Sequence, residues 1–233
     1  MNSTHSNHDL HLAAVDARRW FFRSLAVFIP SVIVAAMLYP GGFDWVYTVV
    51  SSLAAKKYNP IGGPVFSIGF CLSMALLWPY VFDLKKIILP THKYTWIGFV
   101  FLPLGLISGF AMGMERILVY EWSGSYAKTH EILAILTFAG LYFGAIVILL
   151  NLGYRNRNLW LPIFMVLIPI VAIGCSQLYL YFDQRDLGWV NVGWREMGVP
   201  IWLSFAFWQW MAVVFLYIAL GFLSYAFVHK LPD

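Results

Sequence analysis

The chain has 233 residues, of which 61% are hydrophobic and only 11% are charged. A soluble domain carries about 25% charged residues, so this composition excludes an ordinary water-soluble fold and indicates that lipid surrounds most of the chain. The formal net charge of +4 suggests no nucleic acid partner, and no motif calls for a cofactor. We therefore expect one polytopic membrane domain of the all-α class.

The first 19 residues, MNSTHSNHDLHLAAVDARR, are polar and lack the apolar core of a signal peptide. They predict a cytoplasmic tail (1–19) before an uncleaved first span. His5, His8 and His11 recur at three-residue spacing, which on a helix would place them on one face able to hold a metal weakly. A disordered tail is the preferred interpretation.

Six apolar runs are long enough to cross a bilayer as helices, since a span needs roughly 20 apolar residues and backbone groups in lipid must be paired within the segment. Several contain proline, at which we expect kinks and not breaks, because neighbouring helices can satisfy the freed carbonyl groups. Together they predict a membrane domain over 20–228 and a short cytoplasmic tail over 229–233. The runs are Arg23–Tyr39, Pro64–Phe82, Thr95–Met114, Glu131–Asn151, Leu159–Tyr181 and Val199–Phe227.

The cations predict the orientation of these spans. Nine of the fifteen Lys and Arg residues fall on the side that holds both termini, and seven of the eleven Asp and Glu residues fall on the other. Because cytoplasmic loops collect positive charge, both termini are predicted to be cytoplasmic. The protein would then be a multi-pass protein of the plasma membrane, which is the inner membrane in a bacterium.

No Asp, Glu, Lys, Arg or His lies near the middle of a predicted span. Intramembrane ionisable residues usually mark a proton relay or an ion path, so their absence argues against a proton-coupled transporter. The small residues of GLISGFAMG (105–113) predict a close approach between two helices.

The first outer connection, residues 40–64, is too long for a tight turn. The segment FDWVYTVVSSLAAKKY has some amphipathic character and predicts a short interfacial helix. The Pro and Gly residues of NPIGG then predict a turn before the second span.

The second outer connection, ERILVYEWSGSYAKTHEIL (115–133), ends with His130 and Glu131 at the start of the fourth span. Glu131 in the first turn of that helix is explained by the helix dipole alone. Alternatively, His130 and a carboxylate act as base and orienting group, or ligate a metal. Neighbouring helical side chains point about 100° apart, so these two are not expected to face one target.

The third outer connection, residues 182–200, holds both charge signs. Asp183 and Asp186 are three residues apart and could bind a cation, but Arg185 beside them makes solvated ion pairs the simpler interpretation. No metal site is predicted. The candidates for a catalytic role are His130, Glu131, Glu121 and Asp183.

The outer connections and the sixth span together predict a hydrated, polar recognition face. Trp208 belongs to a tryptophan-rich start of the sixth span, which either faces lipid or lines a lipid-sized groove. The candidate binding residues are Ser51, Asn59, Glu115, Arg116, Trp122, Arg185, Asp186, Arg195, Glu196 and Trp208.

The outline resembles the FRAG/DRAM/SFK-type six-span membrane proteins and related bacterial membrane proteins. In that family a Ser-Asp-Leu or Ser-Asp-Thr element follows the first span, and an Asn-Pro or Pro-Glu element leads into the second. Ser51, Leu53, Asn59 and Pro60 stand at the matching places, and Ser52 replaces the usual Asp. A histidine opening the fourth span (HEILAILTFAGLYF, 130–143) and a Trp-rich sixth span are also similar. The resemblance implies lipid-linked or membrane-trafficking roles rather than a defined reaction.

Three functions remain open at this stage. The first is a non-catalytic membrane protein that binds membrane lipids or serves as a subunit beside other integral membrane proteins. The second is a lipid-active, hydrolase-type enzyme that uses His130 with outer carboxylates at the interface. The third is a small-molecule transporter, which would need a polar path at mid-depth.

Overall fold

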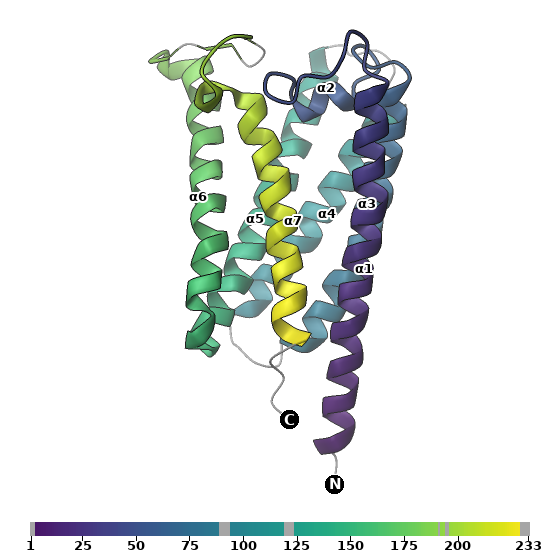
Figure 1. Ribbon diagram of the computed structural model, residues 1–233, viewed down its shortest axis with the longest axis vertical. Coiled ribbons are helices and arrows are strands. Elements are labelled where there is room, and N and C mark those ends of the chain that lie inside the picture. Colours follow the sequence, from purple (N-terminus) through teal and green to yellow (C-terminus); the bar gives the residue numbers. More distant parts are fainter. Residues whose placement is uncertain (1–2, 89–93, 119–123, 191, 194–195, 229–233) are drawn as a thin grey trace.

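The computed structural model describes residues 3–88, 94–118, 124–190, 192–193 and 196–228. Within these ranges the side chains of 3–8, 124–127, 186–187 and 227–228 are left out of the description. The described backbone is helical with no strand, which confirms the all-α class. Figure 1 shows a bundle of long helices that run side by side.

Six of the helices are long and apolar enough to cross a membrane. A seventh, α2, is a single short turn at one end of the bundle. This confirms the predicted number of spans, and the internal prolines lie within unbroken helices. The helices are α1 (Ser3–Met37), α2 (Val50–Ala54), α3 (Gly62–Ile88), α4 (Thr95–Leu118), α5 (Gly124–Arg155), α6 (Trp160–Phe182) and α7 (Phe205–Val228).

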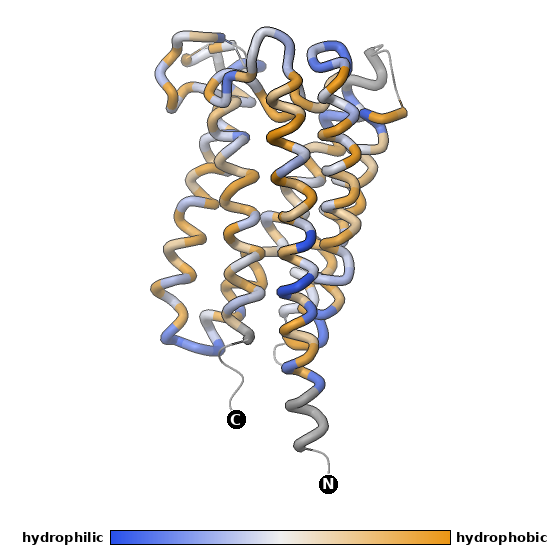
Figure 2. Tube along the Cα trace, turned by 45° about the vertical axis from the view of Figure 1, so that its right-hand side comes forward, coloured by the Kyte–Doolittle hydropathy of each residue, from blue (hydrophilic) through white to orange (hydrophobic). Residues whose placement is uncertain are grey.

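The bundle has two distinct ends. The start of α1 and the end of α7 lie at one end, called here the terminal end, and α2 lies at the other, the α2 end (Figure 1). The hydrophilic positions gather mainly towards these two ends, with apolar chain between them (Figure 2). Both ends of the chain therefore leave the bundle on one side, as the even number of spans requires. That this side is cytoplasmic stays a prediction from charge.

Three boundaries differ from those expected. Helix α1 begins at Ser3, where the sequence suggested a disordered tail, because Ala13, Ala14 and Ala17 form a small buried face that packs into the bundle. The helix expected in the first connection is only Val50–Ala54. The last span begins at Phe205, since a 3-10 turn occupies Ile201–Leu203.

Helices α4 and α5 approach closely through glycine, as the small residues of 105–113 predicted. A Cβ on Gly105 would lie 2.7 Å from the backbone nitrogen of Leu141 and 3.0 Å from the carbonyl oxygen of Thr137. A Cβ on Gly140 would lie 2.6 Å from the backbone nitrogen of Gly105. The two backbones therefore touch near the middle of α4 and α5.

Asn59 joins three helices at the α2 end. Its Nδ2 donates to the carbonyl oxygens of Ala35 and Leu53 at 2.9 and 3.1 Å, and its Oδ1 accepts from the backbone nitrogen of Gly62 at 3.0 Å. The side chain is fully buried. It therefore ties the end of α1 to α2 and to the start of α3.

Candidate functional site

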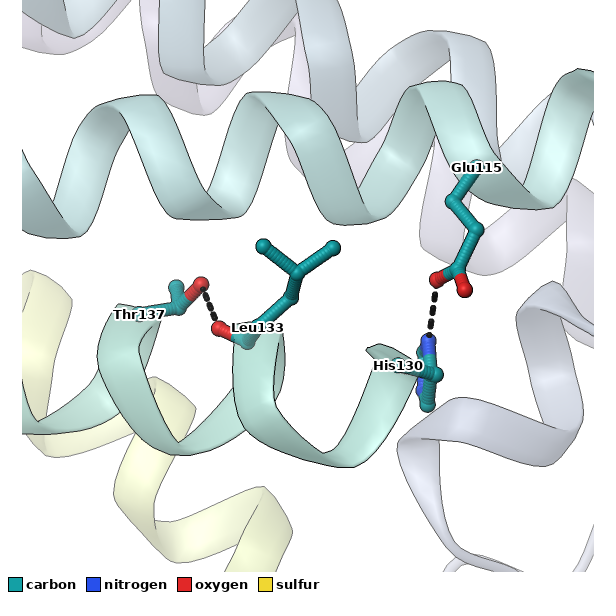
Figure 3. A network of polar contacts seen from close by, with 4 residues as sticks. All are labelled: Glu115, His130, Leu133 and Thr137. Atoms are coloured by element: carbon teal, nitrogen blue, oxygen red, sulfur yellow. Dashed lines mark hydrogen bonds and ion pairs between the residues drawn. The ribbon is translucent and has the colours of Figure 1, made fainter. Parts of the chain in front are cut away.

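A buried acid–base pair links α4 to α5 at the α2 end. Glu115, in the last turn of α4, and His130, near the start of α5, face each other with 3.1 Å between Oε2 and Nδ1 (Figure 3). Their side chains are only 8% and 12% exposed. The expectation that the charges of 115–133 stay hydrated is therefore wrong for this pair.

The pairing follows from the antiparallel packing of the two helices. The end of α4 and the start of α5 flank one connection, so residues at similar depth in the two helices meet across the glycine contact. Figure 3 shows His130, Leu133 and Thr137 in order along α5, with the side chain of Leu133 directed towards α4. Thr137 donates to the carbonyl oxygen of Leu133 at 2.7 Å, which satisfies its hydroxyl within the helix.

An internal cavity of about 70 Å³ lies beside this pair. Its walls come from α1, α2, α3, α4, α5 and α7, and it runs from the α2 end to mid-depth, where Met74, Leu141 and Tyr217 line it. Rings of Phe28, Phe66, Phe70 and Phe138 form much of the apolar wall. The polar lining residues are Ser51, Ser67, Arg116, His130, Thr137, Gln209 and Tyr217.

The buried hydroxyl of Ser67 indicates that the cavity accommodates a polar group. Its side chain is 1% exposed, and its Oγ has no hydrogen-bond partner among the described residues. Buried polar atoms in native proteins are nearly always paired with protein or water, and a cavity of this volume holds several water molecules. Water, or the polar group of a ligand, would therefore meet Ser67 here.

Arg116 brings a permanent positive charge to the same cavity wall. It follows Glu115 on α4 and is 9% exposed, so the last turn of that helix places two ionisable side chains inside the protein. The second oxygen of Glu115, Oε1, is buried without a hydrogen-bond partner in the described part of the chain. Burying charged side chains inside a protein is costly unless they are paired and hydrogen-bonded.

Hydroxyl groups close the cavity at mid-depth. The Tyr217 hydroxyl lies 2.7 Å from Ser73 Oγ, which in turn lies 2.7 Å from Ser24 Oγ. These three side chains connect α7, α3 and α1 and satisfy one another. Below them the interior is filled by buried Leu77, Tyr80, Leu84, Leu220 and Leu223.

The first connection covers the cavity from the α2 end and is anchored to α7. Gln209 Oε1 accepts from the backbone nitrogen of Val50 at 2.8 Å, and Trp210 Nε1 donates to the carbonyl oxygen of Thr48 at 3.1 Å. The Lys56 ammonium donates to the carbonyl oxygen of Ile117, near the end of α4, at 2.7 Å. These contacts place Ser51 on the cavity wall.

Glu131 belongs to a separate cluster. It accepts from the Tyr181 hydroxyl at 2.6 Å and pairs with Arg185, whose guanidinium lies over the Tyr181 ring. His130 and Glu131 thus point to different partners, as the helical geometry predicted. Asp183 is 2% exposed and accepts from the backbone nitrogens of Trp189 and Val190 at 2.7 and 3.0 Å. It orders the third connection, away from His130.

The remaining candidates are dispersed. Trp208 Nε1 donates to the carbonyl oxygen of Trp202 at 2.8 Å, and Glu196 accepts from the backbone nitrogen of Gly193 at 3.0 Å. Glu121, Trp122, Arg195 and the side chain of Asp186 lie outside the described residues. Within the described residues, no three His, Cys, Asp or Glu side chains are placed to hold a metal ion.

Sequence reasoning named His130, Glu115, Arg116 and Ser51 but not the cavity that three of them line. Ser67, Thr137, Gln209 and Tyr217 also line the cavity and were not among the predicted site residues. One feature of the sequence could have predicted that Glu115, Arg116 and His130 lie close together: residues 115–116 and 130 each lie within two helical turns of the same connection. No protein-family model, curated protein or solved structure matches the chain.

Proposed function

We propose that this integral membrane protein binds an amphiphilic, lipid-class ligand at the α2 end, with the polar group and first carbons of the ligand in the internal cavity. The cavity, of about 70 Å³, holds only that part of such a ligand. The observation that carries the proposal is that the cavity wall combines polar and charged side chains with apolar ones. Arg116, His130 and Ser67 line it together with phenylalanine rings and aliphatic side chains. Ligand sites commonly combine an apolar wall with a few polar groups that fix orientation.

The charge on the wall favours an anionic polar group. Arginine stays protonated in proteins and offers a planar set of donors that matches carboxylate and phosphate oxygens. Ser67 supplies a hydroxyl that an oxygen of the ligand would satisfy. The first carbons of the ligand would then extend towards Met74 and Leu141 at mid-depth.

The closed floor of the cavity supports binding over transport. Ser24, Ser73 and Tyr217 satisfy one another at mid-depth, and tightly packed apolar side chains fill the terminal half below them. A transporter needs polar groups that continue across the bilayer, whereas a binding protein needs a pocket closed at one end.

The test is purification of the full chain in lipid nanodiscs, followed by mass spectrometry of the molecules that stay bound. A fluorescent fatty acid serves as a direct probe. We expect a bound amphiphile that Arg116→Gln weakens, whereas Arg157→Gln on the exposed connection between α5 and α6 leaves binding unchanged. Ala134→Phe, which fills the cavity, should abolish binding even where Arg116→Gln proves unstable.

Two outcomes would overturn this proposal. One is equal binding of the probe by wild type and by the cavity-filling Ala134→Phe variant. The other is a stoichiometric protein partner with no bound amphiphile, which would instead favour a subunit of a membrane complex. The exposed apolar side chains of α6, such as Leu161, Met165 and Ile168, would be available to such a partner.

A second candidate is a lipid-active hydrolase, favoured by the 3.1 Å contact between Glu115 and His130. A carboxylate that orients an imidazole beside a pocket is the arrangement of a general base. His130 would take a proton from water as the water oxygen attacks an ester carbonyl carbon, and would return it to the leaving alcohol. Release of fatty acid from a lipid ester, lost in His130→Gln while ligand binding persists, would support this; absence of release would exclude it.

A further inference from the structure

Helix α6 leaves an open space beside the bundle at Gly174. In its terminal half, α6 packs against the bundle with Ile163, Leu167 and Ile170, which recur at helical spacing and are at most 6% exposed. Gly174 is the next residue on this face, and a Cβ built on it would meet no atom of another helix within 4 Å. The inward face of α6 therefore loses its contact with the bundle at this residue.

This open space lies at the depth of the cavity. Glu131 on α5 accepts from the Tyr181 hydroxyl on α6 at 2.6 Å, which aligns the α2 ends of these two antiparallel helices. Gly174 lies about two helical turns from Tyr181, and Phe138, which lines the cavity, lies about two turns from Glu131. Gly174 and Phe138 are therefore at similar depth.

The cavity wall between α5 and α7 is held by few contacts. Helix α5 packs mainly against α4 and touches α7 at few places. The side chains that line the cavity here, Ala134 and Phe138 on α5 and Val213 on α7, are only half-buried. Tyr142, one turn beyond Phe138, donates its hydroxyl to the carbonyl oxygen of Ala212 at 3.0 Å. This bond joins the two helices at the terminal side of the half-buried residues.

The other helix pairs around the cavity approach much more closely. Between α1 and α3, a Cβ on Gly69 would overlap the side chain of Ser31, and between α3 and α4, a Cβ on Gly113 would lie 2.5 Å from Cys71 Sγ. Contacts this close leave no room for a chain of methylene groups to pass. These two sides of the cavity are therefore closed.

The remaining two pairs are closed at the same depth by residues of the cavity wall. Between α4 and α5, a Cβ on Gly109 would lie 3.1 Å from Cγ2 of Thr137. Between α1 and α7, the rings of Phe28 and Tyr217 stack with 5.1 Å between their centroids. The pair α5 and α7 is thus the side through which part of a ligand can leave the cavity laterally.

We propose that the open space at Gly174 is the acyl-chain site of a ligand with a single chain and one anionic group. This inference rests on the proposed function, because it starts from a polar group held near Arg116. The chain would leave the cavity between Ala134 and Val213 and lie against Gly174 of α6. A single outlet suits one chain, and an apolar chain gains by lying against apolar helix surface within the half of the bilayer at the α2 end.

The experiment compares palmitate with octanoate, using equilibrium binding of the radiolabelled acids to the full chain in nanodiscs. Gly174→Trp fills the open space, and we expect it to weaken palmitate binding about tenfold, as overpacking of a filled site does. Octanoate, whose short chain ends near the cavity, should bind as it does to wild type. The control Cys175→Trp places the same ring on an exposed neighbour about 100° around the helix and should change neither.

Each other outcome has a definite meaning. Equal palmitate binding by Gly174→Trp and Cys175→Trp would overturn the acyl-chain site. So would an equal loss of both acids in Gly174→Trp, because the substitution would then act on the cavity itself. Failure of wild type to bind either acid would overturn the proposed function, and this site with it.

Photolabelling of the wild-type protein removes any dependence on variant stability at Gly174. A palmitate analogue with a diazirine near the end of its chain should label residues within 134–142 and 170–178, mapped by mass spectrometry of peptides. The cavity-filling Ala134→Phe variant should lose this labelling. Labels on the first connection (40–54) would overturn the proposal, and so would labels on α6 that persist in Ala134→Phe, because these would come from probe dissolved in the bilayer.

Discussion

The two ends of the bundle hold ionisable side chains in opposite ways. At the α2 end, Glu115, His130 and Asp183 are buried and each has a defined partner. At the terminal end, Arg19 and Asp16 pair one turn apart at 66% and 48% exposure, and the less exposed Asp83 pairs with Lys86, which is 67% exposed. Burying a charge is costly unless it is paired and hydrogen-bonded. The α2 end is therefore where the fold maintains specific chemistry, and the terminal end is where charge meets the surrounding medium.

The largest expected effect on stability comes from Asn59, which joins three helices at the α2 end. Asn59→Ala removes two donated bonds and one accepted bond and leaves buried backbone groups unpaired. We expect the free energy of unfolding to fall by about 3 kcal/mol. Thermal unfolding in nanodiscs, followed by tryptophan fluorescence, measures this. Asn156→Ala, which loses an exposed cap at the other end, should cost about 1 kcal/mol; equal losses would break the contrast between the ends.

A smaller effect is expected from the acid–base pair. Glu115→Gln keeps the shape of the side chain but removes the charge opposite His130. Because hydrogen bonds to charged groups contribute about 1.5–3 kcal/mol, we expect stability to fall by about 2 kcal/mol. A double-mutant cycle with His130→Gln should show coupling between the two sites. Additive losses would mean that the contact contributes nothing to stability.

Asp183→Asn should have a more local consequence. Two backbone nitrogens of the third connection donate to the same carboxylate oxygen, Oδ1, and the neutral amide oxygen of asparagine is a weaker acceptor than a charged carboxylate. We expect a loss of about 1 kcal/mol and faster hydrogen exchange at the amides of Trp189 and Val190. Exchange at the glycine contact between α4 and α5 should not change. Unchanged exchange at 189–190 would show that Asp183 does not order this segment.

The smallest effect is expected at the terminal end. The ammonium of Lys86 lies 2.7 Å from Asp83, and the lysine side chain is 67% exposed. Lys86→Gln should change stability by no more than about 0.5 kcal/mol, measured by the same unfolding experiment. A loss as large as that of Glu115→Gln would contradict the view that charge at this end is only loosely held.

Hydropathy was sufficient to find the six spans, because lipid imposes one length and one composition on every helix that crosses it. It did not find the start of α1, although the small residues Ala13, Ala14 and Ala17 recur at helical spacing with Phe21. The cavity was out of reach for a different reason. Ser67 on α3 is far in sequence from Gln209 and Tyr217 on α7, and the three line one cavity only because the helices pack together, which no local pattern records.

The hydroxyl chain of Tyr217, Ser73 and Ser24 bears on how the ligand proposed above would enter and leave the cavity. Because these groups are satisfied by one another and lie above closely packed leucine side chains, a ligand of the kind proposed above would have no path through the terminal half of the bundle. Such a ligand would enter and leave the cavity on the same side, towards the α2 end. Occupancy would then follow the concentration on a single side of the membrane, as in a receptor that samples one compartment.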